Sequence, residues 1–297
     1  MFSNNKVVKN LFFVALLGFC FNALSNLLEE KEKIAPNLVV HGTHETFDKI
    51  REVIENREKG VYYRFGDGEI IFAYGENILE HKGSDEAAKE IREAFLMNGP
   101  NIIKAIPLYC RELGGHENGM FPGNHEDNLE WCMNMLRKSN ALWGEEITDV
   151  YSHVALHFSA TSYTEDCIKF LKFLKDNNCY IFIGNRNIPK HIRDLLFGPD
   201  CKFVPTPPRD AYSEVDRIEK ECLEKIENDG EYKIIVTAVG PVGKILQKRL
   251  WDKYDNVFFF DFGSLIDALC GWRSRAWIKL TKFNARNFIR KMHEHGF

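Results

Sequence analysis

Short apolar runs alternate with longer amphipathic segments through the second half of the chain. The apolar runs are continuous, which is typical of strands buried on both faces of a parallel sheet. The segments between them carry apolar residues at helical spacing. The pattern therefore predicts an α/β fold, a mostly parallel sheet with helices on both faces. The expected strands are 179–183, 202–204, 232–239 and 257–260, and the expected helices are 164–176, 189–197, 213–227 and 241–254.

The first half follows the same alternation less regularly. Thr43 or Thr46 is expected to cap a helix that ends near Glu58, and Ser84 to cap a helix over 85–97. In a strand-like run over 150–158, His153 and His157 would share a face as packing or rim residues, and His157 is a weak site candidate. The remaining expected elements are strands over 61–65 and 101–106, a loop over 110–127 and a helix over 127–138.

The amino terminus has a targeting pattern. Lys6 and Lys9 precede an apolar run over 11–24 that extends more loosely to Leu28. This layout is that of a signal peptide, with small residues for cleavage after Ser25, or of a short type II membrane anchor. With the lysines on the cytoplasmic side, the rest of the chain would face a lumen within the secretory pathway. A cytoplasmic-facing protein remains an alternative.

The chain shows no internal repeat and no low-complexity linker, so one catalytic domain is expected. Its carboxyl-terminal segment has seven Lys or Arg residues and no acid between Arg273 and Lys291. This segment could lie on an anionic membrane or pack on the domain with a solvated basic face, which we favour. The expected divisions are a signal peptide or anchor over 1–28, a stem over 29–39, the domain over 40–271 and a basic helix over 272–297.

Composition narrows the function classes. The apolar share of 44% and the 23 phenylalanines among 297 residues suffice for a large core. A net charge of −4 argues against a general nucleic-acid binder. The eight cysteines show no Cys-x-x-Cys or Cys/His spacing of a zinc site.

The most informative motif is Arg64-Phe65-Gly66-Asp67-Gly68-Glu69, which ends an apolar run. In an open parallel sheet, ligands bind at the carboxyl ends of the strands. Gly68 would let the backbone turn tightly, so that Asp67 and Glu69 aim at one small volume. Two carboxylates suit Mn²⁺ or Mg²⁺. The alternative is a turn with two solvated acids.

Three further strand ends carry glycine and polar residues. A turn at a helix start can bind a phosphate through backbone amides, and a nearby lysine adds positive charge. A plain strand-to-helix turn is the alternative there. Four such ends on one edge are what a nucleotide cleft requires. The three motifs are Gly184-Asn185-Arg186-Asn187, Gly240-Pro241-Val242-Gly243-Lys244 and Asp261-Phe262-Gly263-Ser264-Leu265-Ile266-Asp267.

Together these motifs resemble those of the GT-D-type glycosyltransferases, in consistent order over about residues 40–270. The Arg-Phe-Gly-Asp-Gly-Glu match is the most specific. The resemblance implies a Rossmann-like transferase in which Asp67 and Glu69 hold a divalent metal against the diphosphate of a nucleotide sugar. The chain departs from the family in its last motif, where bacterial members carry a histidine near the position of Ser264.

The leading hypothesis is therefore a metal-dependent glycosyltransferase. Its expected partners are a UDP-sugar or similar donor, a glycan, protein or lipid acceptor, and a membrane, but no nucleic acid. Arg64, Lys244 and the amides of the Gly240–Gly243 turn would assist electrostatically. Asp210, Asp261 and Asp267 are alternative general bases. A metal-dependent phosphoesterase and a non-catalytic, membrane-anchored nucleotide- or glycan-binding module are the competing hypotheses.

Overall fold

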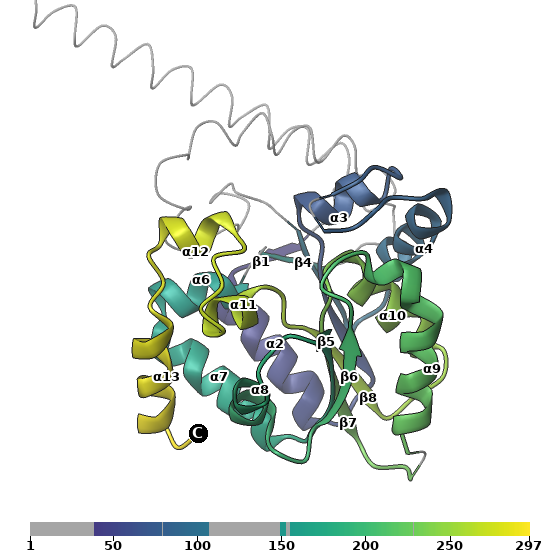
Figure 1. The fold of residues 1–297 in the computed structure, drawn as a ribbon. Coiled ribbons are helices and arrows are strands. Elements are labelled where there is room, and N and C mark those ends of the chain that lie inside the picture. The colour runs from purple at the N-terminus through teal and green to yellow at the C-terminus, as the bar shows by residue number, and fades with distance from the viewer. Residues whose placement is uncertain (1–38, 79, 107–148, 153–154, 228) are drawn as a thin grey trace, which may run out of the picture.

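A single parallel sheet organises the molecule (Figure 1). The computed structural model describes residues 39–78, 80–106, 149–152, 155–227 and 229–297. Within these residues, eight strands form one sheet in the order β1-β4-β3-β2-β8-β7-β5-β6, and every pairing is parallel. The strands are β1 Val39–His41, β2 Gly60–Arg64, β3 Ile102–Ile106, β4 Asp149–Ser152, β5 Cys179–Asn185, β6 Lys202–Thr206, β7 Lys233–Ala238 and β8 Val257–Asp261.

Helices cover both faces of this sheet, as expected for the α/β class. The alternation of side chains along each strand divides the core: Tyr63 and Phe259 pack on one face, whereas Tyr62 and Phe258 pack on the other. The first face is covered by α3 Asp67–Phe72, α4 Asp85–Leu96, α9 Val215–Lys225 and α10 Pro241–Trp251. The second is covered by α2 Thr43–Glu55, α6 Ala155–Ser162, α7 Thr164–Asp176, α8 Lys190–Phe197, α11 Leu265–Leu269, α12 Ala276–Leu280 and α13 Ala285–Glu294.

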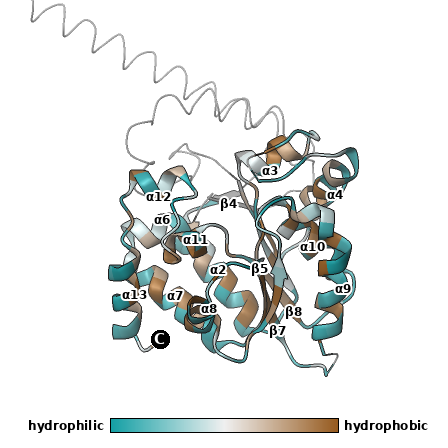
Figure 2. Ribbon diagram, in the orientation of Figure 1, coloured by the Kyte–Doolittle hydropathy of each residue, from teal (hydrophilic) through white to brown (hydrophobic). Residues whose placement is uncertain are grey.

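The helices confirm the amphipathic pattern, since their apolar sides face the sheet (Figure 2). Ser84 caps α4 as predicted, with its hydroxyl accepting a hydrogen bond from the Ala87 amide at 3.1 Å. The cap of α2 is Gly42, neither of the two threonines that the sequence suggested. There the Glu45 carboxylate accepts a hydrogen bond from the Gly42 amide at 3.1 Å. The glutamate half of a capping box therefore starts this helix.

Two expectations about elements are wrong, and one strand was missed. The run over 150–158 is not one strand, because strand β4 ends at Ser152 and helix α6 begins at Ala155. The basic carboxyl-terminal segment forms two helices, α12 and α13, with Lys282 at a positive φ of 52° between them. The edge strand β1 was not anticipated, since it is only 3 residues long.

Most apolar residues of the basic segment face the body of the protein, whereas Leu280 is 52% exposed. Phe288 and Met292 of α13 are buried, as are Trp277 and Ile278 of α12. The favoured interpretation, a terminal segment packed on the domain, is confirmed. The expected loop over 110–127, the helix over 127–138 and the targeting segment lie outside the described residues. Within the described part of the chain, no helix is long and apolar enough to cross a bilayer.

Lys104 on β3 is a buried cation. Only 3% of its surface is exposed, and its ammonium donates a hydrogen bond to the Phe95 carbonyl near the end of α4, at 2.6 Å. A cation at a helix carboxyl terminus is favourable. Burial nevertheless lowers the pKa of Lys104 to about 8.

This depressed pKa predicts that stability rises with pH in the alkaline range. Between about pH 8 and pH 10.4 the unfolded chain binds more protons at Lys104 than the folded one, so the free energy of unfolding increases with pH. Relative to Lys104→Met, the wild type should gain about 1–3 kcal/mol across this window. Urea unfolding of both proteins at several pH values measures the gain. A difference that stays constant with pH would contradict the desolvation of Lys104.

Candidate functional site

The four motif-bearing strand ends lie at one edge of the sheet, because all strands run parallel. They belong to β2, β8, β7 and β5, which are consecutive neighbours in the sheet. Arg64 and Asp261 end two adjacent strands, and the Gly240 turn follows the third. The convergence inferred from the sequence is thus observed at the centre of the sheet.

The acidic motif is the start of a helix and not the tight turn expected. Gly66 is the cap of α3, and Asp67 is its first residue. Glu69 Oε2 accepts a hydrogen bond from the Gly66 amide at 2.8 Å, which is again the glutamate half of a capping box. A Cβ at Gly68 would meet only an ordinary contact at 3.5 Å, so glycine is not sterically required there.

Lys244 on α10 joins this helix to the end of β8. Its ammonium lies 2.8 Å from Glu69 Oε1 and 2.6 Å from Asp261 Oδ2. The side chains of Lys244 and Asp261 are 1% and 2% exposed, and that of Glu69 is 12% exposed. Lys244 therefore forms a buried ion triad with two carboxylates.

The triad sets the charge state of Glu69. Burial alone would raise its pKa, but the Lys244 ammonium, the Arg64 guanidinium and the Gly66 amide outweigh burial and hold the pKa below its usual value. Glu69 is therefore ionised at neutral pH.

The Gly240 turn has two glycines with different tasks. Gly240 caps α10 at a φ of 57°, which favours glycine. Pro241 follows as the first helical residue, where a missing amide hydrogen costs nothing. A Cβ at Gly243 would lie 3.0 Å from Thr237 Oγ1. Gly243 therefore allows α10 to pack closely on β7.

Arg64 lies between Asp261 and His157. Its Nε is 3.6 Å from Asp261 Oδ2, and its Nη1 is 2.8 Å from Nε2 of His157. Gly263 has a φ of 63°, and a Cβ there would fall 2.3 Å from Arg64 Cζ. The Gly263 turn thus leaves the space that the guanidinium occupies.

His157 contributes more than its weak candidacy suggested. It is 2% exposed, and its ring stacks on Trp277 at a centroid distance of 4.8 Å. The Ser264 amide donates to His157 Nε2 at 3.1 Å, and Arg64 donates to the same nitrogen. Arg64 Nη1 also lies 3.3 Å from Nδ1 of the same ring, so the guanidinium faces both ring nitrogens. Ser264 Oγ in turn accepts a hydrogen bond from Trp277 Nε1 at 2.9 Å.

His81 is a residue that the sequence did not indicate. It lies in a short turn between α3 and α4 that is closed by paired hydrogen bonds with Ile78. A Cβ at Gly240 would lie 3.1 Å from its Nε2, so the imidazole rests against the Gly240 turn. Burial lowers the pKa of His81 despite neighbouring carboxylates. Its buried Nδ1 has no hydrogen-bond partner within the described residues.

The other candidates lie further from the triad or have partners of their own. Asn185 ends β5 and accepts a hydrogen bond from the Asn187 amide at 2.9 Å, which forms a local turn. Asp210 accepts a hydrogen bond from the Lys82 amide at 3.4 Å. Asp267 accepts one from Ser274 Oγ at 2.6 Å, and burial raises its pKa.

The described carboxylates do not fit a divalent metal ion as they stand. Both oxygens of Glu69 are engaged, by Lys244 and by the Gly66 amide. Asp261 is engaged by Lys244 and by the Gly263 amide at 3.1 Å. No group of three His, Cys, Asp or Glu residues that could hold a metal occurs in the described ranges. The side chain of Asp67 lies outside the description, so its predicted role stays a prediction.

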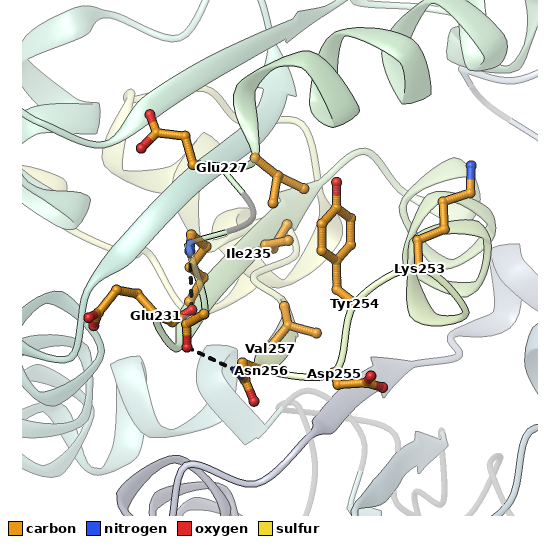
Figure 3. A pocket seen from close by; sticks show the side chains of 11 residues that line it. Glu227, Glu231, Ile235, Lys253, Tyr254, Asp255, Asn256 and Val257 are labelled. Atoms are coloured by element: carbon orange, nitrogen blue, oxygen red, sulfur yellow. Dashed lines mark hydrogen bonds between the residues drawn. The ribbon is translucent and has the colours of Figure 1, made fainter.

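A pocket of about 240 Å³ lies at the opposite edge of the sheet (Figure 3). Its lining includes Lys233 and Val257, which are the first residues of β7 and β8. Because both strands are parallel, the pocket is at their amino ends, away from Asp261. We therefore do not associate it with the ion triad.

Comparisons with known proteins identify the family. The family model described as "Glycosyltransferase GT-D fold" matches residues 62–285, which is most of the chain. The chain belongs to the GT-D glycosyltransferase family. The enzyme is accordingly a glycosyltransferase, and the phosphoesterase alternative loses its basis. No curated protein sequence is significantly similar to the chain.

Solved structures similar to this GT-D glycosyltransferase share its fold at low sequence identity. One, titled "The highly conserved domain of unknown function 1792 has a distinct glycosyltransferase fold", has a TM-score of 0.58 at 16% identity and covers 83% of this chain and 86% of its own. Another, "A New Glycosyltransferase (DUF1792) from Streptococcus sanguinis", has a TM-score of 0.56 at 16% identity and covers 79% and 86%.

The close approach of Arg64 to Gly263 gives a steric prediction. In Gly263→Ala the new Cβ would force the guanidinium away from Asp261 and His157, so glycosyltransferase activity should fall at least about tenfold. The positive φ should also lower the free energy of unfolding by about 1–2 kcal/mol. Activity and urea unfolding measure the two effects.

Gly271 provides the matched control. It has a φ of 76°, but a Cβ there would meet nothing within 4 Å. Gly271→Ala should therefore lose a similar amount of stability and keep its activity. Equal activities in the two variants would show that the position of Arg64 is unimportant.

Proposed function

We propose that this glycosyltransferase uses a nucleotide-diphosphate sugar as its donor, with a UDP-sugar as the first to test. The observation that carries the proposal is the convergence of four neighbouring strand ends at one edge of a parallel sheet. Nucleotides bind at this edge in open α/β sheets. The acceptor is a glycan, a protein or a lipid, and its identity follows from no feature of the described residues.

The positive groups at this edge would act on the leaving group. Transfer breaks the bond between the anomeric carbon and the diphosphate oxygen, so negative charge accumulates on the diphosphate. The amino terminus of α10 carries the positive end of the helix dipole, and Gly240 lets the backbone approach a ligand closely. Arg64 is fixed in place by Asp261 and His157. A fixed guanidinium stabilises developing charge without reorganisation.

His81 is the base that we assign to the acceptor. It rests against the Gly240 turn, and its lowered pKa keeps the imidazole neutral at pH 7. A neutral imidazole can take the proton that the acceptor hydroxyl loses as its oxygen bonds to the sugar. Of the three aspartates considered from the sequence, Asp261 is already committed to Lys244 and Arg64.

Metal dependence and location belong to the same proposal. Mn²⁺ or Mg²⁺, if used, would rest on Asp67 and on the diphosphate itself, because Glu69 is engaged by Lys244. The apolar run after Lys9 supports a single-pass type II anchor or a signal peptide, with the catalytic domain in the secretory pathway.

Nucleotide binding can be tested by thermal unfolding of the full chain. UDP at about one hundred times its Kd should stabilise the protein by about 2.7 kcal/mol, which raises Tm by about 5–10 °C. Arg64→Met should lose most of this shift relative to its own ligand-free Tm. Lys248→Met should keep it, because Lys248 lies on α10 and is bonded to Asp252 at the surface. No shift with UDP, GDP or ADP, with or without Mn²⁺, would refute the proposed donor class.

The role of His81 predicts a specific pH profile. His81→Gln should lower kcat by about 10²–10⁴-fold. It should also abolish the decrease in wild-type rate at acidic pH, where the depressed pKa of His81 is crossed and the base becomes protonated. His191→Gln is the control, since His191 is an exposed residue of α8. An unchanged acidic limb in His81→Gln would assign the base elsewhere.

A further inference from the structure

The place between Glu69 and Asp261 is already filled by a cation of the protein. Lys244 Nζ lies within 3 Å of an oxygen of each carboxylate, and it also donates a hydrogen bond to the Gly240 carbonyl at 3.2 Å. Sequence reasoning assigned a divalent metal ion to Glu69. The structure puts an ammonium beside the oxygen that such an ion would need.

The remaining oxygens are not available either. Glu69 Oε2 caps α3 through the Gly66 amide, and Asp261 Oδ1 accepts the Gly263 amide. Asp261 Oδ2 faces both Lys244 and, at 3.6 Å, Arg64. A metal ion could bind these carboxylates only by displacing groups that belong to helix starts and turns.

Charge balance opposes that displacement. Arg64 and Lys244 carry two positive charges, and Glu69 and Asp261 carry two negative charges, so the cluster is neutral. A divalent ion on either carboxylate would take one of the two counter-ions of Lys244, which is 1% exposed, and ions on both would leave it with none. An uncompensated buried charge is strongly destabilising. Lys244 cannot withdraw easily, because it lies in the first turn of α10, which packs on β7 through Gly243.

We propose that Lys244 is the resident cation of this site and that Glu69 is its counter-ion and helix cap, not a metal ligand. Any divalent ion that the enzyme uses is then held without Glu69 and Asp261. Removing Lys244 would turn these two carboxylates into a metal site that the wild type does not have. The inference concerns the same site as the proposed sugar transfer. Only its relevance to catalysis rests on that proposed function.

Mn²⁺ binding to the full chain in mild detergent tests the inference, with free Mn²⁺ measured by electron paramagnetic resonance. Glu69→Gln should leave the Mn²⁺ affinity of the wild type unchanged. Lys244→Met should bind Mn²⁺ at least about tenfold more tightly, because two carboxylates lose their cation. Lys244→Arg, which keeps the charge, should gain nothing, and adding Glu69→Gln to Lys244→Met should remove the gain. An affinity loss of about tenfold or more in Glu69→Gln, or no gain in Lys244→Met, would overturn the inference.

Thermal unfolding in EDTA decides the matter if Lys244→Met does not fold. As the counter-ion of Lys244, Glu69 stabilises the metal-free protein, so Glu69→Gln should have a lower Tm in EDTA, and Mn²⁺ should not change the difference. A metal ligand would behave oppositely: Glu69→Gln would be no less stable than the wild type in EDTA, and a deficit would arise only with Mn²⁺. Neither readout involves a sugar donor, so failure of the proposed donor class leaves both results interpretable.

Discussion

A buried ammonium held between two carboxylates is the constraint on which the site depends. Lys244 and Glu69 are 175 residues apart in the sequence, and Asp261 ends a central strand. Because separating a buried pair leaves an unpaired charge, α3, α10 and β8 cannot shift independently without a large cost. The Lys244 side chain thereby holds the end of β8 and the start of α3 in place. It also holds the start of α10, through the Gly240 carbonyl.

Arg64 extends this constraint to the other face of the sheet. It meets Asp261 beside the triad, and it meets His157 among helices of the opposite layer. His157 is held by the ring of Trp277 and by the Ser264 amide. At the strand ends, the Arg64 guanidinium therefore contacts both Asp261 of the triad and His157 of the opposite helical layer. Such a group keeps its orientation when a charged ligand arrives, which is the property that electrostatic catalysis requires.

The sequence predicted the sheet well because buried parallel strands are continuous apolar runs, and parallel strands bring their ends to one edge. It failed at 150–158 because an apolar run of this length fits a strand or a helix equally. The contribution of His157 was underestimated for the same reason, because His157 lies in helix α6, where its ring meets Ser264. The cap formed by Glu69 was visible as Gly-x-x-Glu, the pattern that also starts α2. His81 gave no signal, because its position depends on a turn closed by backbone hydrogen bonds.

Whether the two acids of an Asp-x-Glu motif can bind one metal ion depends on the local backbone conformation more than on the residue types. In a strand or an extended turn, positions two apart lie on the same side, so two carboxylates can meet at one ion. In a helix, positions two apart do not face each other. The motif begins α3, with Asp67 first and Glu69 third. The sequence suggested Glu69 as one of a pair of metal ligands. The helical backbone instead gives it to the cap of α3 and to Lys244.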